Sequence, residues 1–239
     1  MTDWGAVIDA TWPAAAVQQV GPWTLRSGAG GGNRVSAATA NGPVRAQDIS
    51  VAADAMRAAG QEALFMVRPG EDALDALLAE AGYIKRDETL IRACLTARLT
   101  ADPVPPVTAF TVWPPLAAQR DIWASGGIGP ARLAIMDRVQ GPKTTIFGRI
   151  DDRPAGTLFV AIHDGIAMLH ALEITQDHRR KGLARHLTRA AARWAQRQGA
   201  DQFALLVTAA NGGANALYAG LGLGEAARYH YRAAPQESL

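Results

Sequence analysis

The sequence has very little cysteine, since Cys94 is the only one among 239 residues. A single cysteine excludes an internal disulfide framework and is typical of a protein in a reducing compartment. In an apolar context such a residue is more often part of the core than a nucleophile. The five histidines and the cysteine also lack the spacing of metal ligands, so we expect no metal ion.

A targeting segment and a strong net charge are absent as well. The N-terminus carries Asp3 and Asp9 and no basic segment before an apolar run, and no apolar run is long enough to span a membrane. The net charge of +2 gives no reason to expect a nucleic-acid partner. We therefore expect a cytoplasmic globular protein of one large or two small domains, with no membrane partner. These features do not indicate an oligomeric state.

The most informative segment that is present runs from Leu169 to Arg185. An apolar run up to Ile174 predicts a buried strand, the polar and basic residues 176–181 predict a loop, and apolar residues at helical spacing after Gly182 predict a helix. Such a loop directs backbone N–H groups and the positive end of a helix dipole at one point, which favours a phosphate or pyrophosphate. Glycine lets a ligand approach the backbone closely. The alternative is a surface loop that happens to be basic.

An internal repeat appears when the chain is aligned with itself so that Val67 falls on Val207. The same alignment places Leu77 on Leu217 and Gly82 on Gly222. The order of predicted elements agrees as well, which indicates two related halves. The basic loop falls on residues 39–44 of the first half, which lack basic residues and contain Pro43 in place of an N–H donor. The first half is therefore interpreted as a degenerate copy that serves as a support or as a wall of the substrate cleft.

Other patterns predict further elements. Residues 14–20 read as a short helix after the helix at 4–12, and residues 34–39 read as a strand. The glycines at 28–32 are interpreted as a hairpin connection or a close backbone approach, because no helix follows them directly. Along the helix after the basic loop, arginines recur every four residues and are interpreted mainly as a solvated face: Arg185, Arg189, Arg193 and Arg197.

Two motifs resemble those of the GNAT family of N-acetyltransferases. The first, Arg179-x-x-Gly182-x-Ala184, resembles the acetyl-CoA signature Arg/Gln-x-x-Gly-x-Gly/Ala. The second resembles the later pattern Asn-x-x-Ala-x-x-Leu-Tyr-x-x-Leu-Gly-Phe and consists of Asn211, Ala214, Leu217, Tyr218, Leu221 and Gly222, with Leu223 in place of Phe. The match covers about residues 107–232. On this resemblance the chain is identified as a member of the family.

The resemblance implies an α/β (α+β) fold with a mixed, mostly antiparallel twisted sheet flanked by helices. It implies a catalytic domain at residues 107–239, preceded by a degenerate GNAT-like domain at residues 1–101. We expect the boundary at the proline-rich residues 102–106.

The resemblance also implies roles for particular residues toward acetyl-CoA. The backbones of Leu172 and Ile174 would bind the pantetheine arm and polarise the acetyl carbonyl, and Asn211 would contact the cofactor, unless it only forms a turn. The expected cofactor-binding residues are Leu172, Ile174, Arg179, Arg180, Lys181, Gly182, Leu183, Ala184 and Asn211, with the amides of Arg180 to Ala184 on the pyrophosphate.

Two residues are expected to take part in proton transfer. Tyr218 matches the tyrosine that often protonates the departing thiolate; the alternative is a core tyrosine whose hydroxyl meets solvent. Glu173 is the candidate base, and the alternative is an ion pair with a neighbouring arginine. His170 is a weaker candidate and reads better as a satisfied histidine. Trp123 and Arg132 are equally consistent with an acceptor cleft and with packing or surface positions.

The function that these residues predict is acetyl transfer from acetyl-CoA directly to a primary amine of an unidentified acceptor. The alternative is a non-catalytic acyl-CoA-binding sensor or scaffold. A nucleotide-phosphate enzyme is a further rival, although no Gly-Lys-Ser/Thr motif is present.

Overall fold

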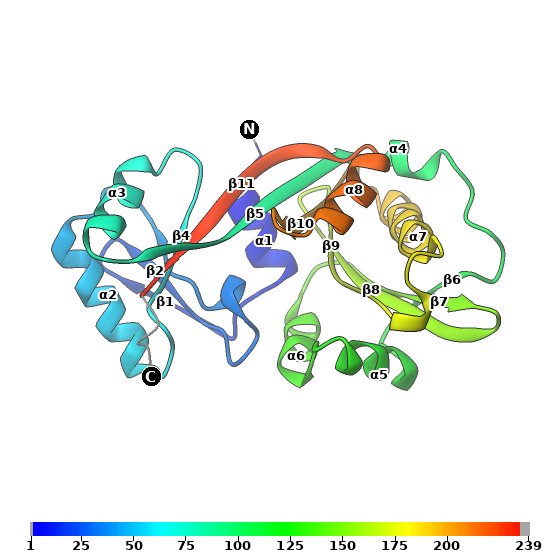
Figure 1. Cartoon of the computed structure of the whole chain (residues 1–239), viewed down its shortest axis with the longest axis horizontal. Coiled ribbons are helices and arrows are strands. Elements are labelled where there is room, and N and C mark those ends of the chain that lie inside the picture. Colours follow the sequence, from blue (N-terminus) through cyan, green and yellow to red (C-terminus); the bar gives the residue numbers. More distant parts are fainter. Residues whose placement is uncertain (1, 235–239) are drawn as a thin grey trace. The chain divides into compact units, whose positions relative to one another are not determined.

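The computed structural model describes residues 2–234, which fall into two compact units whose elements are labelled in Figure 1. Unit 1 comprises Met1–Pro13, Ile91–Val207 and Gly212–Ala226, and unit 2 comprises Ala14–Leu90, Thr208–Asn211 and Ala227–Leu239. Residue 1 and residues 235–239, which belong to the predicted domain ranges, lie outside the described residues. No described helix has the length and apolar character that crossing a membrane requires.

Unit 1 is built on a mixed sheet with helices on both faces. Its elements, with β5 and β11 shared with unit 2, are α1 (Trp4–Thr11), β5 (Ile84–Leu95), α4 (Thr96–Thr100), β6 (Ala109–Val112), α5 (Ala117–Ser125), α6 (Pro130–Arg138), β7 (Lys143–Ile150), β8 (Arg153–His163), β9 (Ile166–Ile174), the 3-10 helix Gln176–His178, α7 (Leu183–Arg197), β10 (Gln202–Thr208), α8 (Gly212–Gly220) and β11 (Gly224–Ala233). The strand order is β11, β5, β10, β9, β8, β7, β6. The strands from β6 to β9 pair antiparallel and β9 pairs with β10 in parallel, which confirms the expected mixed, mostly antiparallel sheet.

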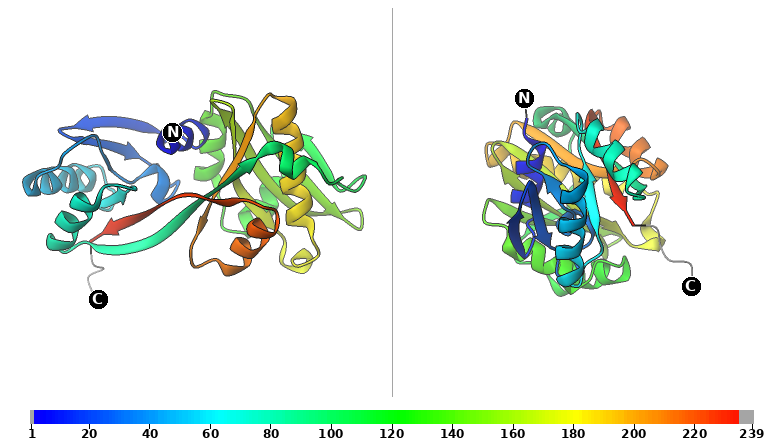
Figure 2. Two further views of the ribbon diagram at one scale, coloured as in Figure 1. Left: turned by 90° about the horizontal axis from the view of Figure 1, so that it is seen from above. Right: turned by 90° about the vertical axis from the view of Figure 1, so that its left-hand side faces the viewer.

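Two neighbouring glycines bring helix α7 close to one face of this sheet. A Cβ atom on Gly148 would lie 2.8 Å from the Leu187 side chain. A Cβ atom on Gly156 would lie 2.5 Å from Ile174 and 3.2 Å from Leu183. Because Leu183 and Leu187 belong to α7, the helix that carries the basic loop at its start packs closely on the strands at these two glycines. Figure 2 shows α7 lying along the sheet.

The other face of the sheet is covered by α5 and α1. The buried side chain of Gln119 in α5 donates a hydrogen bond of 2.9 Å to the hydroxyl of Thr157. Thr157 follows Gly156 directly, and successive side chains of a strand point to opposite faces, so α5 and α7 lie on opposite faces. On the α5 face, Trp12 at the end of α1 packs against Phe159 with ring centroids 6.2 Å apart.

Unit 2 contains a separate small sheet and two helices around an aromatic core. Its further elements are β1 (Ala16–Val20), β2 (Trp23–Ser27), the 3-10 helix Asn33–Val35, β3 (Thr39–Ala40), α2 (Ala46–Ala58), β4 (Leu64–Val67) and α3 (Asp72–Glu80). The small sheet has the order β1, β2, β3, and the second set of strands has the order β4, β11, β5. Trp23 and Phe65 are fully buried with ring centroids 4.9 Å apart.

Two sequence predictions in unit 2 are wrong. Residues 14–20 do not form a helix, because Gly21, with φ of +55°, turns the chain into a hairpin in which Val20 pairs with Trp23. Residues 34–39 do not form one strand either, since a 3-10 helix ends at Val35 and only Thr39–Ala40 pairs with β2. Gly28 does show a close approach, since a Cβ there would lie 2.0 Å from the hydroxyl of Ser36.

The internal repeat relates the last three elements of each half. It places α3 on α8 and the start of β5 on the start of β11. Gly82 and Gly222 end the two helices with φ of +84° and +83°. In the sheets, however, β4 pairs with β11 and β5 lies next to β10, so each half gives its last strand to the other half's sheet.

The predicted domain ranges 1–101 and 107–239 therefore need correction. Because of this strand exchange, residues 91–101 belong to unit 1 and residues 227–234 to unit 2, so no single cut in the sequence separates the units. Residues 1–13 also belong to unit 1, because α1 packs on β8 and β9.

The proline-rich connection and the arginine stripe also differ from expectation. The connection does not separate the units; it joins α4 to β6 within unit 1. Arg189 forms an ion pair with Asp102, and Arg193 donates hydrogen bonds to the carbonyls of Thr100 and Asp102. The middle of the arginine stripe therefore holds this connection on α7 instead of facing only solvent.

Candidate functional site

Strand β9 bulges immediately before the residues expected to bind the cofactor. The register of β8 and β9 moves from Phe159 opposite His170 to Thr157 opposite Glu173, so one extra residue is inserted in β9. Ala171 takes up this insertion with φ of +51°. The fully buried Trp123 of α5 donates its indole N–H to the Ala171 carbonyl at 2.7 Å. The bulge is thus fixed from α5, and Trp123 is a packing residue, not part of an open acceptor cleft.

Beyond the bulge, β9 separates from its parallel neighbour. The pairing of β9 with β10 runs from Ile166 opposite Gln202 to Leu169 opposite Leu205, and the described residues show no further pair. Leu172 and Ile174, both half-buried, follow this point. Their backbones therefore lie in the part of β9 that is not committed to β10, which is the arrangement that binding an extended arm requires.

The basic loop presents a set of free backbone donors. Arg180 and Gly182 have φ of +64° and +83°, and Gly182 is the N-cap of α7. Within residues 2–234, the N–H groups of residues 180–184 donate no hydrogen bond. Free N–H groups at the start of a fifteen-residue helix form a favourable anion site.

A cavity next to this loop is lined by charged side chains of both signs, among them Arg149, Lys181, Asp151 and Asp152. Its volume is about 390 Å³, and Leu183 and His186 line it as well. Burial lowers the pKa of His186, and the neighbouring Arg189 and Arg185 lower it further. The imidazole is therefore charged less often at neutral pH than a free histidine, and the positive charge of the loop comes mainly from its lysine and arginines.

Glu173 is engaged with the loop. Its carboxylate lies 3.1 Å from the Arg179 guanidinium, whose Nε also donates to the Ile174 carbonyl at 3.1 Å. The Glu173 side chain is only 17% exposed and packs on the backbone of Gly126, where a Cβ would lie 2.5 Å from the carboxyl carbon. The ion pair named as the alternative for Glu173 is thus present, and the role of Glu173 as a general base stays a prediction.

Tyr218 lies on α8 and is 6% exposed. Burial raises the pKa of its phenol to about 12. The hydroxyl therefore keeps its proton at neutral pH, as a proton donor must. Asn211 closes the turn before α8, since its backbone N–H donates to the Thr208 carbonyl at 3.0 Å. The turn named as the alternative for Asn211 is thus present, and its contact with the cofactor stays a prediction.

The weaker candidates have structural environments. His170 is 3% exposed, stacks on Trp12 at 4.8 Å between centroids, and lies 3.0 Å from the Thr11 hydroxyl. Cys94 is half-buried in β5, where burial raises its pKa. Arg132 is half-buried on α6, and its backbone N–H donates to Gly129. None of the three lies in the loop or the bulge.

Sequence reasoning missed how α5 supports β9. Nothing in the spacing of Trp123 indicates that its indole reaches the carbonyl at a bulge, because the bulge itself has no sequence signature around Ala171. The pair Gly126-Gly127 at the end of α5 is a usable signal, since a glycine there permits the close approach of Glu173.

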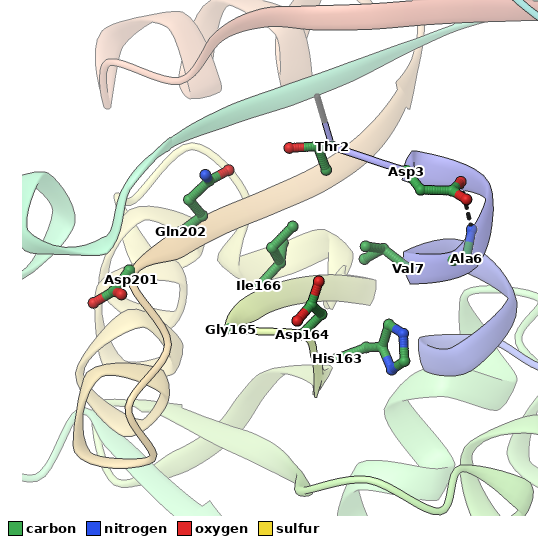
Figure 3. A pocket seen from close by; sticks show the side chains of 10 residues that line it. All are labelled: Thr2, Asp3, Ala6, Val7, His163, Asp164, Gly165, Ile166, Asp201 and Gln202. Carbon is green, nitrogen blue, oxygen red and sulfur yellow. Dashed lines mark hydrogen bonds between the residues drawn. The ribbon is translucent and has the colours of Figure 1, made fainter.

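A second cavity of unit 1, of about 460 Å³, lies at the beginning of β9 and β10 (Figure 3). Asp3, Asp164 and Asp201 line it together with His163 and residues of α1. No predicted site residue lines this cavity. Within the described residues, no group of three or more histidine, cysteine, aspartate or glutamate side chains is arranged to hold a metal ion.

Comparisons with known proteins find similarity to acetyltransferases. A model of the acetyltransferase (GNAT) family matches residues 113–223. The chain is 26% identical over 237 residues to the uncharacterized N-acetyltransferase YobR of Bacillus subtilis strain 168, and the match covers 93% of this chain and 94% of that protein.

Solved structures show the same fold over nearly the whole chain. A GCN5-related N-acetyltransferase from Kribbella flavida has a TM-score of 0.69 at 19% identity, covering 98% of this chain and 95% of that one. A tandem GNAT protein from the clavulanic acid biosynthesis pathway has a TM-score of 0.61 at 16% identity, covering 89% and 77%. At these identities the likeness concerns the fold, and the second structure agrees with an architecture of two related halves.

Proposed function

Because a model of the acetyltransferase (GNAT) family matches residues 113–223, we propose that this protein moves an acetyl group from acetyl-CoA directly to a primary amine. One observation carries the proposal. The N–H groups of residues 180–184 are free and lie directly after a bulged strand that has separated from its neighbour. A diphosphate with an extended arm fits such a loop and strand together.

In the proposed reaction, the amides of Arg180 to Ala184 bind the pyrophosphate, with Arg179 and Lys181 adding positive charge. The backbones of Leu172 and Ile174 bind the pantetheine arm and direct an N–H at the acetyl oxygen. As the amine nitrogen bonds to the carbonyl carbon, negative charge develops on that oxygen, where fixed N–H donors stabilise it most.

Breaking the C–S bond then releases a thiolate. Tyr218 donates its phenolic proton to that sulfur, which its raised pKa supports because the phenol is fully protonated at neutral pH. The attacking amine must also lose a proton. We propose that Glu173 accepts it, directly or through water, at the side of its carboxylate that Arg179 leaves available.

The ion pair of Glu173 with Arg179 also favours the second candidate function, a non-catalytic acyl-CoA-binding sensor. One oxygen of this carboxylate already accepts a hydrogen bond from Arg179 at 3.1 Å, so a protein with this pair could bind the thioester without turning it over. The single cysteine supports a cytoplasmic location for either function.

Binding is tested by calorimetric titration of acetyl-CoA into the wild type, Gly182→Ala and Gly199→Ala. The two glycines flank α7 with φ of +83° and +82°, so alanine introduces a similar backbone strain at both. Gly182→Ala is expected to weaken binding at least about tenfold, whereas Gly199→Ala binds like the wild type. Equal affinities of the wild type and both variants for acetyl-CoA would show that the loop is not part of the binding site.

Transfer is tested separately by thiol release from acetyl-CoA with a panel of small amines, amino acids, aminoglycosides and peptide N-termini. Acetylation of any of these amines supports the enzyme. Tight binding of acetyl-CoA without transfer across the panel supports the sensor, and tighter binding of ATP than of CoA would support a nucleotide-phosphate enzyme.

A further inference from the structure

Two arginines at equivalent positions of the internal repeat make the same set of contacts. In unit 1, Arg92 of β5 donates its Nε to Asn215 Oδ1 at 3.0 Å and an Nη to the carbonyl of Leu223 at 3.2 Å. We call these three residues clasp 1. Its arginine lies in a strand that begins in the first half of the sequence, while its two acceptors belong to the second half.

Clasp 2 repeats this pattern in unit 2. Arg232 of β11 donates its Nε to Asp75 Oδ1 at 2.7 Å and an Nη to the carbonyl of Tyr83 at 3.0 Å. The alignment that relates the two halves places Arg92 on Arg232, Asp75 on Asn215 and Tyr83 on Leu223. In each clasp the arginine comes from one half of the sequence and its two acceptors from the other half. The two clasps are therefore reciprocal: each half supplies the arginine that holds the other half's last helix and turn.

The two acceptors of clasp 1 lie on either side of Tyr218, the candidate proton donor, along the chain. Asn215 precedes Tyr218 by three residues and therefore lies one turn earlier on the same side of α8. Leu223, the second acceptor of Arg92, donates its own N–H to the Tyr218 carbonyl at 3.0 Å. One planar guanidinium thus fixes α8 before and after Tyr218, which limits rotation of the helix about its axis.

We propose that Arg92 is a positioning residue for Tyr218, and that supplying this arginine is what the first half of the chain contributes to acyl transfer. The inference rests on the proposed function, because it concerns the direction in which Tyr218 delivers its proton. Clasp 2 holds α3, where Leu78 stands in place of the tyrosine. Clasp 2 is therefore a built-in control that shares the geometry but lacks the phenol.

Hydrogen–deuterium exchange of the full chain tests the clasps without any acceptor. Arg92→Gln is expected to speed exchange about tenfold in peptides covering residues 212–223 and to leave residues 72–83 unchanged, since about one hydrogen bond's worth of local stability is lost. Arg232→Gln is expected to do the reverse. Unchanged exchange at 212–223 in Arg92→Gln would overturn the proposal.

Turnover then separates positioning from folding. With an amine identified by the panel, Arg92→Gln is expected to lower kcat about tenfold while KM for acetyl-CoA stays within about twofold, because proton delivery is misdirected but the cofactor site is intact. Arg232→Gln should turn over like the wild type. Arg92→Lys, which can satisfy one acceptor at a time, should recover part of kcat.

The outcomes remain distinguishable from failure of the proposed function. If the wild type transfers to no amine, the proposed function fails, while the exchange pattern still decides whether Arg92 orders α8. Equal losses of kcat in Arg92→Gln and Arg232→Gln would show that both clasps only stabilise the fold and would overturn the positioning role.

Discussion

Among single residues, Tyr218 gives the sharpest prediction. Tyr218→Phe keeps the buried ring and removes only the hydroxyl, so kcat with an acetylated amine is expected to fall about a hundredfold while KM for acetyl-CoA is unchanged. The phenol loses its proton only near its pKa of about 12. Deprotonation of Tyr218 should therefore not lower the kcat of the wild type between pH 7 and 10. The pH profiles of kcat for the wild type and for Tyr218→Phe should have the same shape over this range. A decline of kcat in the wild type that is absent from Tyr218→Phe would contradict the donor role.

Asp75 gives a pH prediction about stability. Its hydrogen bond from Arg232, opposed by burial and supported by His230, lowers the pKa of the carboxyl from 3.8 to about 2. A lowered folded-state pKa means that this stabilisation is complete above pH 3.8 and is lost as the pH falls through about 2. After allowance for solvent screening, the contribution is about 1 to 2 kcal/mol.

Urea unfolding at pH 4 and at pH 2 measures this contribution. The free energy of unfolding of the wild type should fall more between these two pH values than that of Asp75→Asn, which has no carboxyl to protonate. The same fall in both proteins would mean that Asp75 is not the group responsible.

The chemistry of individual residues could be predicted from the sequence only where a motif names them. The motifs around Tyr218 and Gly182 predict a proton donor and a phosphate loop, and both roles stay predictions. Glu173 could not be decided, because its pairing with Arg179 depends on how the loop folds back after Ile174. Arg92 could not be recognised at all, since its acceptors lie far away in the sequence, in the other half of the chain.

For the elements, the packing of α7 on the sheet is the feature to test. Gly156→Ala would force Ile174 and the start of α7 away from β8, because its Cβ would lie 2.5 Å from Ile174. We expect a loss of about 1 to 3 kcal/mol in stability and weaker binding of acetyl-CoA. Thermal unfolding and calorimetry measure the two effects.

Gly224→Ala is the matched control, since a Cβ at that glycine meets nothing within 4 Å. The control should keep both the stability and the affinity of the wild type. If Gly156→Ala behaved like Gly224→Ala, the close packing of α7 on the sheet would not depend on a glycine at position 156.

Helices and strands with a strong periodicity of apolar residues could be predicted from the sequence. Strands that form only because they pair with a neighbouring strand could not. The segments that became β9 and α7 have clear apolar patterns on either side of the basic loop, and the predictions agree with the structure. Residues 16–20 are mostly exposed, so their hydrophobic pattern carries no information and only the hairpin register with β2 makes them a strand.

For the whole molecule, the strand exchange predicts that the halves are not independent. Fragments 1–101 and 107–239 expressed separately would each lack a strand of their own sheet, and the second would also lack α1. We expect that neither fragment unfolds cooperatively, which circular dichroism would measure. We also expect that fragment 107–239 does not bind acetyl-CoA, which calorimetry would measure. A folded fragment 107–239 that binds acetyl-CoA would refute this expectation.

The division of the molecule was the least predictable feature. The internal repeat correctly related α3 to α8, but similarity between halves does not say which half a strand pairs with. The proline-rich residues 102–106 were a reasonable boundary by composition, and the contacts of Arg189 and Arg193 show why they are instead part of unit 1.

The exchange also bears on the order in which the protein can form during synthesis. Leu64 and Phe65 in β4 pair with Ala233 and Arg232, which are synthesised long after them. The first half must therefore wait with an open strand edge until β11 has been synthesised. Such an edge can recruit other nascent chains, so we expect the yield of native protein to depend on chaperones that shield this edge until β11 pairs with it.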